Sequence, residues 1–162
     1  MKAALLIVDM QKGCKGNDSK ETMEKATEYI NYTSDFFRKF GQTVVVIQDL
    51  SVGDDPDSKE FEVLDEIEVS DTDLVVHKHE CNAFFDTNLH ELLKDRGIEL
   101  VVVCGYHAEN CVLFTYNGAC ELGYTAAILQ NGIAGSNYLD VQNVQLKRPV
   151  VSHTVLELML KK

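Results

Sequence analysis

The sequence predicts a three-layer α/β/α fold, doubly wound around a mostly parallel sheet of five to six strands. Its strand-like runs are uniformly apolar and rich in β-branched residues, which is typical of strands buried on both faces. Segments with a helical pattern separate these runs, and right-handed helical crossovers between buried strands give a parallel sheet. The length of 162 residues suffices for one substantial core, so we expect a single domain over residues 1–162.

In the first half of the chain, capping residues and glycines mark the ends of the expected elements. Asp18 or Ser19 can cap a helix that runs to about residue 40, where Gly41 stops it. A long acidic connection, residues 54–73, follows the second strand and contains Pro56. The strands expected in this half cover residues 3–8, 43–47 and 73–77, and a further helix is expected over residues 87–96, ended by Gly97.

The second half continues the alternation of strands and helices. Leu100 to Val103 form a fourth buried strand, which Gly105 is expected to break, and a helix follows from about residue 109 to 122. The fifth strand covers residues 125–129, and Asn131-Gly132 is expected to begin a loop. The remaining expected elements are a short helix over residues 139–147, a short strand at 150–151, and a helix to residue 160 that Ser152 caps.

Composition and charge exclude several classes of function. The net charge is −11, of which residues 54–73 contribute −9, and no basic stripe is present that could neutralise the phosphates of a nucleic acid. No apolar run approaches the ~20 residues of a membrane span and the N-terminal apolar stretch is too short for a signal peptide, so we expect no membrane contact and a cytoplasmic location. Five cysteines without a Cys-x-x-Cys pair indicate reduced thiols.

Three chemically active residues follow three of the expected strands. Asp9 ends the first strand, Lys78 ends the third, and Cys111 lies in the first turn of the helix after the fourth. The carboxyl ends of parallel strands meet at one edge of a sheet, where ligands bind. Free N–H groups and the helix dipole favour a thiolate at the position of Cys111. The three residues therefore predict a base, an orienting cation and a nucleophile.

The sequence around these residues resembles the isochorismatase-like cysteine hydrolases, the superfamily that includes nicotinamidases and N-carbamoyl amidohydrolases. The resemblance extends from Lys2 to about Asn137, and it implies the three-layer fold described above. Three blocks carry it in this order and spacing: Ala4-Leu5-Leu6-Ile7-Val8-Asp9-Met10-Gln11, then Val76-His77-Lys78 with Asn82-Ala83-Phe84-Phe85-Asp86-Thr87-Asn88-Leu89, and then Val103-Cys104-Gly105-Tyr106-His107-Ala108-Glu109-Asn110-Cys111-Val112-Leu113-Phe114-Thr115.

The resemblance implies a catalytic triad of Asp9, Lys78 and Cys111. It also implies a cis peptide bond between Tyr106 and His107, with an oxyanion hole from the backbone N–H groups of His107 and Cys111. The implied reaction is acyl transfer from a small carboxamide or carbamoyl (ureido) substrate to sulfur, through a thioester and without a cofactor, in a protein that forms homo-oligomers. The substrate contacts that we expect are Gln11, Cys14, Asn82, Phe84 and Tyr106.

The sequence departs from the family pattern around the expected pocket. Nicotinamidases carry an Asp-x-His pair after the second strand to bind a metal, but this chain has Asp49-Leu50-Ser51, so we expect no metal site. Isochorismatases proper lack the cysteine nucleophile, and Cys111 therefore argues against their ether cleavage. The other departures leave the triad intact and do not identify the substrate. They are at Gly13-Cys14, Asn82, Ala108-Glu109, Thr115-Tyr116 and Asn131.

Two other functions remain open from the sequence alone. The chain could be a catalytically silent binding or assembly module that kept the fold, with residues 54–73 as the partner surface. Alternatively, Cys111 could be a redox-sensing thiol that oxidises reversibly without hydrolysis. No resolving cysteine is evident for this second role, because Cys120 would lie about 13 Å from Cys111 along the same helix.

Overall fold

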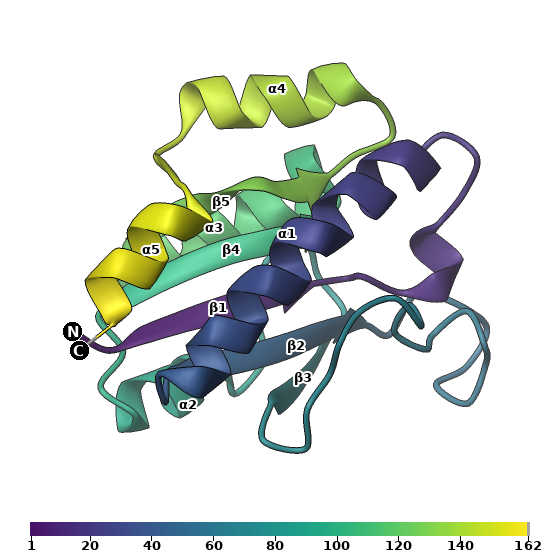
Figure 1. Cartoon of the computed structure of the whole chain (residues 1–162). Coiled ribbons are helices and arrows are strands. Elements are labelled where there is room, and N and C mark those ends of the chain that lie inside the picture. The colour runs from purple at the N-terminus through teal and green to yellow at the C-terminus, as the bar shows by residue number, and fades with distance from the viewer. Residues whose placement is uncertain (162) are drawn as a thin grey trace.

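The computed structural model describes residues 1–161 and contains one six-stranded sheet with the order β3-β2-β1-β4-β5-β6 (Figure 1). Every pair of neighbouring strands is parallel, so the predicted three-layer, doubly wound fold is confirmed and the sheet is wholly parallel. The strands are β1 (Ala3–Val8), β2 (Thr43–Asp49), β3 (Leu74–Lys78), β4 (Leu100–Tyr106), β5 (Thr125–Ala134) and β6 (Val150–Val151).

Helices cover both faces of this sheet, as Figure 1 shows. One apolar cluster contains Phe37 and Leu156, from two helices that pack against each other on the same face. The cluster on the opposite face contains Leu93, Tyr116 and Val144, from the three other helices. None of the helices in the described part of the chain could span a membrane. The α-helices are α1 (Lys20–Lys39), α2 (Leu89–Asp95), α3 (Leu113–Glu121), α4 (Tyr138–Lys147) and α5 (His153–Leu160).

The central strand β1 explains why the strand-like runs of the sequence are uniformly apolar. All six of its side chains are buried. Successive side chains of a strand point to opposite faces, and accordingly Leu5 belongs to the cluster of α1 and α5 while Leu6 belongs to the cluster of α2, α3 and α4. A strand that is buried on both faces leaves no position for a polar side chain until it ends, at Asp9.

β4 and β5 run well past the residues at which the sequence predicted their ends. β4 continues through Gly105, with a shift in its register against β5 between Val103 and Gly105. β5 continues through Asn131-Gly132 to Ala134, so the prediction of a loop there was wrong. Gly105 has φ 108° and Asn131 has φ 60°. Glycine and asparagine tolerate positive φ, and the strands absorb these positions as local irregularities without ending.

Gly105 pairs with Val8 of β1, whose backbone leaves no room for a side chain at this position. A Cβ atom at this position would lie 2.1 Å from the carbonyl oxygen of Val8 and 2.7 Å from its backbone nitrogen. We expect the substitution Gly105→Ala to lower the free energy of unfolding by about 3 kcal/mol, because it adds an overlap with backbone to an unfavourable φ. The melting temperature should fall by roughly 6–12 °C, which circular dichroism measures.

The matched control for this prediction is Gly123→Ala. Gly123 also has a positive φ, of 87°, but no heavy atom lies within 4 Å of the position that its Cβ would take. The difference between the two variants therefore isolates the contact with Val8 from the cost of the backbone conformation. Equal losses of stability in the two variants would contradict the role that we assign to the close approach.

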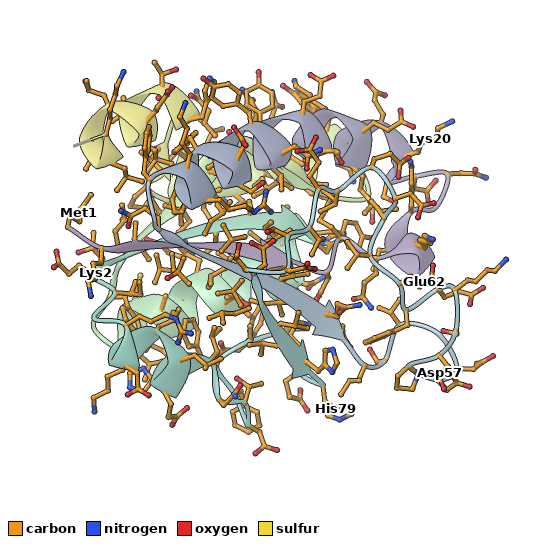
Figure 2. The ribbon with its side chains drawn as sticks, turned by 60° about the horizontal axis from the view of Figure 1, so that its bottom comes forward. Met1, Lys2, Lys20, Asp57, Glu62 and His79 are labelled. Atoms are coloured by element: carbon orange, nitrogen blue, oxygen red, sulfur yellow. The ribbon has the colours of Figure 1, made fainter. Side chains whose placement is uncertain are left out.

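The acidic segment 54–73 is partly bound to the rest of the protein and is not only a solvated connection. Asp54 and Asp57 are exposed, and Asp57 lies at the rim of the molecule, as Glu62 does (Figure 2). Other acids of the segment pair with basic residues outside it: Asp65 with Lys12 at 2.9 Å, Glu66 with Lys15 at 2.6 Å, and Asp73 with Arg38 at 2.8 Å. Several negative charges of the segment are thus paired with positive charges elsewhere in the molecule.

Candidate active site

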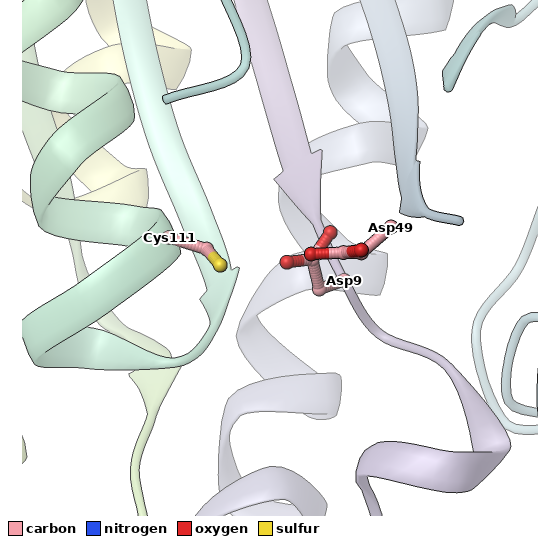
Figure 3. Close-up of side chains that lie close together, drawn as sticks. All are labelled: Asp9, Asp49 and Cys111. Atoms are coloured by element: carbon pink, nitrogen blue, oxygen red, sulfur yellow. The ribbon is translucent and has the colours of Figure 1, made fainter. Parts of the chain in front are cut away.

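Four side chains meet at the carboxyl edge of the sheet. Asp9 directly follows β1, Asp49 ends β2, and Lys78 ends β3 in register with Asp49. Cys111 lies in a π-helical turn, Ala108–Val112, which follows β4 and leads directly into α3, so it stands in the first turn of the predicted helical segment. Its sulfur atom points toward the two carboxylates (Figure 3), and the ligand atoms of Asp9, Asp49 and Cys111 all lie within 4.8 Å of one another.

The ammonium group of Lys78 lies at the centre of this cluster. Its Nζ atom is 2.9 Å from Oδ2 of Asp9, 2.8 Å from Oδ2 of Asp49 and 3.4 Å from Sγ of Cys111. The side chain is only 1% exposed, and a buried ammonium is tolerable only when it is paired and hydrogen-bonded. Burial alone would lower the pKa of Lys78, but Asp9, Asp49 and Cys111 together raise it above its usual range. Lys78 therefore remains charged.

The donor atoms of Asp9, Asp49 and Cys111 are of the kind that bind metal ions. Their common cation is already present, because the Nζ atom of Lys78 contacts all three. A divalent ion bound to the same two carboxylates would lie close to this buried positive charge, and the two cations would repel each other strongly. The arrangement fits an internal ammonium and does not fit a metal site.

Asp9 is suited to accept a proton. The side chain is 2% exposed, and burial raises the pKa of Asp9 to about 6, although Lys78 and the Cys111 thiol both act to lower it. One carboxylate oxygen, Oδ2, is held by Lys78. The other, Oδ1, is buried and has no hydrogen-bond partner among the described residues. This second oxygen is free to take a proton from a neighbouring group.

The surroundings of Cys111 favour the thiol at rest, against the tendency toward a thiolate that a position at the start of a helix gives. Burial and then the Asp9 carboxylate raise the pKa of Cys111 well above its usual range, and the attraction of Lys78 offsets only part of this effect. Burial and the full negative charge of the neighbouring Asp9 carboxylate act against the thiolate, and together they outweigh the attraction of Lys78 and the partial charge of a helix terminus. The resting pair is thus a thiol beside an ionised carboxylate.

The segment before Cys111 contains the peptide bond between Tyr106 and His107, which is cis. The His107 carbonyl accepts hydrogen bonds from the backbone N–H groups of Asn110, at 3.0 Å, and Val112, at 3.1 Å. The ring atom Nε2 of His107 lies 2.9 Å from Oγ of Ser136, a residue that follows β5. The turn that carries Cys111 is therefore fixed both by its own backbone and by the end of the neighbouring strand.

Among the predicted substrate contacts, Cys14 and Tyr106 lie near the reactive cluster. Both are half-buried. Burial and then the charge of Asp9 raise the pKa of Cys14 to about 12, and burial raises the pKa of Tyr106, with Cys14 and Cys111 adding to the effect. These two residues remain candidates for contact with a substrate.

The other three predicted contacts have structural partners. Gln11 is fully buried, and its side-chain amide bonds the backbone of Asp49 and Phe61, so it is not available to a substrate. Asn82 accepts a hydrogen bond from the Phe84 backbone N–H at 3.0 Å, and Phe84 itself stacks on Tyr124 with ring centroids 6.0 Å apart. Asn82 and Phe84 therefore support the region around α3.

Asp49 was not predicted as a member of the site. The apolar run of the second strand ends at residue 47, two residues before β2 itself ends, so the strand-end rule that found Asp9 and Lys78 did not reach Asp49. Gln48 and Asp49 are both buried at the end of this strand. A polar pair directly after an apolar run was the signal that could have identified Asp49.

Comparison with known proteins identifies the family of this chain. The model of the isochorismatase domain family matches residues 3–153. The chain is 31% identical over 149 residues to the isochorismatase family protein YrdC of Bacillus subtilis, covering 86% of this chain and 77% of that protein. It is 32% identical over 131 residues to a streptothricin hydrolase of Streptomyces noursei, covering 77% of this chain and 47% of that protein. The structure of N-carbamoylsarcosine amidase from Thermoplasma acidophilum aligns with a TM-score of 0.80 at 27% identity, over 94% of this chain and 95% of that one. This chain therefore belongs to the isochorismatase family of hydrolases.

Proposed function

We propose that this protein is a cysteine-dependent amidohydrolase that cleaves a C–N bond in a small carboxamide or carbamoyl (ureido) compound through a thioester. The observation that carries the proposal is the contact of one buried ammonium, that of Lys78, with both the Asp9 carboxylate and the Cys111 sulfur. The similarity to an enzyme named as an N-carbamoylsarcosine amidase supports this class of substrate.

In the first step, the sulfur of Cys111 attacks the carbonyl carbon while Asp9 accepts the thiol proton. An S–C bond forms, and the π electrons of the carbonyl move to its oxygen. The raised pKa of Asp9, about 6, makes its carboxylate a stronger base than an ordinary aspartate, and Lys78 at 3.4 Å stabilises the charge that develops on sulfur. The negative charge leaves Asp9 and appears on the thiolate and then on the oxyanion.

The oxyanion is held by the backbone N–H groups of His107 and Cys111 in this proposal. Each such donor is worth about 3 kcal/mol in a preorganised site. The electrons then return to the carbonyl, the C–N bond breaks, and the proton on Asp9 passes to the departing nitrogen, so that ammonia or an amine leaves. Asp9 next removes a proton from water, which attacks the thioester. The C–S bond breaks, the proton returns to sulfur, and the product is a carboxylic or carbamic acid.

The pH dependence of turnover follows from the protonation state of the Asp9 carboxyl group. Below its pKa of about 6 the carboxyl is protonated and cannot accept the thiol proton. We expect kcat/KM to fall close to tenfold per pH unit below about pH 6, and to be nearly flat from pH 6.5 to 7.5. Ammonia release measured from pH 4.5 to 8 checks this. An acid limb centred near pH 4, the value for an ordinary aspartate, would contradict the assignment of Asp9 as the base.

The experiment that tests the proposed function is a panel of small carboxamides and ureido compounds assayed for release of ammonia or amine. Rapid acid quenching during turnover, followed by mass spectrometry of the peptide that contains Cys111, should detect an acyl group on that sulfur. The internal controls are Cys81 and Cys120, which are exposed and should carry no acyl group. Turnover without an acylated Cys111 in either steady state or burst phase would contradict a thioester mechanism.

The alternatives of a silent binding module and a redox-sensing thiol have less support. The acidic segment proposed as a partner surface uses several of its carboxylates in pairs with Lys12, Lys15 and Arg38. The raised pKa of Cys111 also disfavours a peroxide sensor, because the thiolate is the form that oxidises readily. Both observations favour a thiol that is activated only when Asp9 removes its proton.

A further inference from the structure

We infer that Asp49 is a positioning residue of this site: it shares the ammonium of Lys78 with Asp9 and thereby keeps Asp9 available as a base. The Nζ atom of Lys78 is 2.8 Å from Asp49 and 2.9 Å from Asp9, so neither carboxylate dominates the pair. The inference deepens the proposed function and rests on it for its kinetic consequences, whereas its electrostatic consequences are measurable without turnover.

The contacts of Lys78 explain why the sharing is stable. An ammonium group has three N–H donors and no acceptor. In this site the ammonium donates hydrogen bonds to Asp49 at 2.8 Å and to the sulfur of Cys111 at 3.4 Å, and it forms an ion pair with Asp9 at 2.9 Å. Without the Asp49 carboxylate, one donor would be released, and the full charge of Lys78 would act on Asp9 alone. Asp9 would then be held in its ionised form more strongly and would accept the thiol proton less readily.

Asp49 is itself held in place from two sides. The Gln11 side chain accepts a hydrogen bond from the Asp49 backbone N–H at 2.8 Å and donates one to its carbonyl at 3.1 Å. The carboxylate oxygen Oδ1 accepts bonds from the backbone N–H and the hydroxyl of Ser51, at 2.8 Å and 2.5 Å. Gln11 fixes the main chain and Ser51 fixes the carboxylate, which leaves Oδ2 directed at Lys78.

The two carboxylates have opposite titration behaviour. Burial raises the pKa of Asp49 by itself, but its bonds to Lys78 and Ser51 outweigh burial and lower that pKa below its usual range. For Asp9, burial dominates, and the charge of Asp49 adds to the increase. Two neighbouring acids whose environments separate their pKa values take different roles, one as a fixed charge and one as a proton carrier.

Four groups face Asp9 from the elements packed around it. They are Lys78 on β3, Asp49 on β2, Cys111 in the π turn, and Cys14 in the short helical turn Lys12–Cys14. Lys78 keeps its charge, and the pKa values of Cys14 and Cys111 are both raised, so these thiols are neutral in the resting enzyme. Asp49 is therefore the one negative charge among these four groups that acts on Asp9.

The first experiment is the titration of the wild-type protein carrying ¹³C-labelled aspartate, followed by NMR with Asp9→Asn and Asp49→Asn used for assignment. We expect a midpoint near pH 6 for Asp9 and a midpoint lower than that of an ordinary aspartate for Asp49. In Asp49→Asn the midpoint of Asp9 should fall by one pH unit or more, toward that of an ordinary aspartate. An Asp9 midpoint that stays unchanged in folded Asp49→Asn would overturn the inference.

Kinetics provide the second readout once a substrate is known. We expect Asp49→Asn to lower kcat by 10- to 100-fold, to change KM by less than 3-fold, and to move the acid limb of the pH profile down with the Asp9 midpoint. The control variant Asp54→Asn removes an exposed carboxylate outside the site and should leave the acid limb within about 0.3 pH unit of its original position.

The two proposals fail in distinguishable ways. A shifted Asp9 midpoint without turnover of any substrate would retain the inference about Asp49 and reject the amidohydrolase. Turnover with an acid limb that does not move in Asp49→Asn would retain the amidohydrolase and reject the inference about Asp49. If Asp49→Asn does not fold, the wild-type titration still decides, because Asp9→Asn identifies the Asp9 signal and an Asp9 midpoint at or below that of an ordinary aspartate is incompatible with the inference.

Discussion

Replacing Asp9 by asparagine is expected to abolish turnover while making Cys111 react with alkylating agents at a lower pH. Asparagine has nearly the same shape but cannot accept the thiol proton, and loss of such a base lowers kcat by roughly 10³- to 10⁴-fold. The Asp9 charge is also one of the main causes of the raised pKa of Cys111. Its removal leaves the sulfur beside Lys78, at 3.4 Å, and so favours the thiolate.

The measurement is the rate of alkylation of each cysteine as a function of pH, followed peptide by peptide in the native protein. Cys104 and Cys120 are matched references on the same chain, one buried and one exposed, and their rates should not change. The variant Cys111→Ala should lose both turnover and the responsive peptide. If alkylation of Cys111 in Asp9→Asn moved to higher pH, Asp9 would be stabilising the thiolate, and its assignment as the base would be wrong.

Replacing Lys78 by methionine is expected to lower the free energy of unfolding at pH 7 by about 3–5 kcal/mol, because it leaves two buried carboxylates without their cation. Asp9 is 2% and Asp49 is 9% exposed, so water reaches neither freely. Chemical denaturation followed by circular dichroism measures the loss. The matched control is Lys12→Met, since Lys12 also pairs with two acids, Glu62 and Asp65, but at the surface, where such pairs contribute little to stability.

The loss of stability in Lys78→Met should depend on pH with a definite sign. Without the ammonium, burial and mutual repulsion raise the pKa values of both carboxyls in the folded state above their unfolded values. A raised folded pKa contributes stability that is present at low pH and is lost as the pH rises. The variant should therefore be closest to wild type near pH 5 and furthest from it at pH 7 and above. A constant difference across this range would show that packing, and not charge, causes the loss.

The double variant Lys78→Met with Asp49→Asn separates these contributions further. Removing one of the two stranded carboxylates should restore part of the stability at pH 7, although each single substitution is destabilising. Residues that share one ion cluster are expected to show such coupling. Additive losses would indicate that Asp49 and Lys78 do not interact in the folded protein, against the distance of 2.8 Å between them.

The positions of Asp9, Lys78 and Cys111 at one edge of the sheet followed from the sequence because each stands directly after an apolar run or soon after one. Strand pattern and the rule that strand ends meet were sufficient for these residues. Asp49 was missed because Gln48 interrupts the apolar pattern before it, and the sequence does not show that Gln48 is buried with its side chain bonded to the Phe61 carbonyl.

The protonation states were less predictable than the positions. A thiol near a helix start suggests a thiolate, but whether Asp9 or Lys78 has the larger effect depends on burial and on distances of a few tenths of an ångström. Gln11 shows the same limit for specificity. Its polar side chain near the base suggests a ligand contact. In the structure, however, the side-chain amide donates hydrogen bonds to the carbonyls of Asp49, at the end of β2, and Phe61, within the acidic segment.

The contact of Gly105 with the Val8 backbone has a consequence for how new specificities are obtained on this scaffold. Val8 directly precedes Asp9, and Gly105 precedes Cys111 by six residues. The distance between base and nucleophile therefore depends on the contact between the backbones of Val8 and Gly105. Side-chain exchange at surrounding positions such as Cys14 or Asn110 does not alter that spacing. A library that randomises the surroundings and leaves Gly105 untouched should thus explore substrates while the reactive geometry is inherited intact.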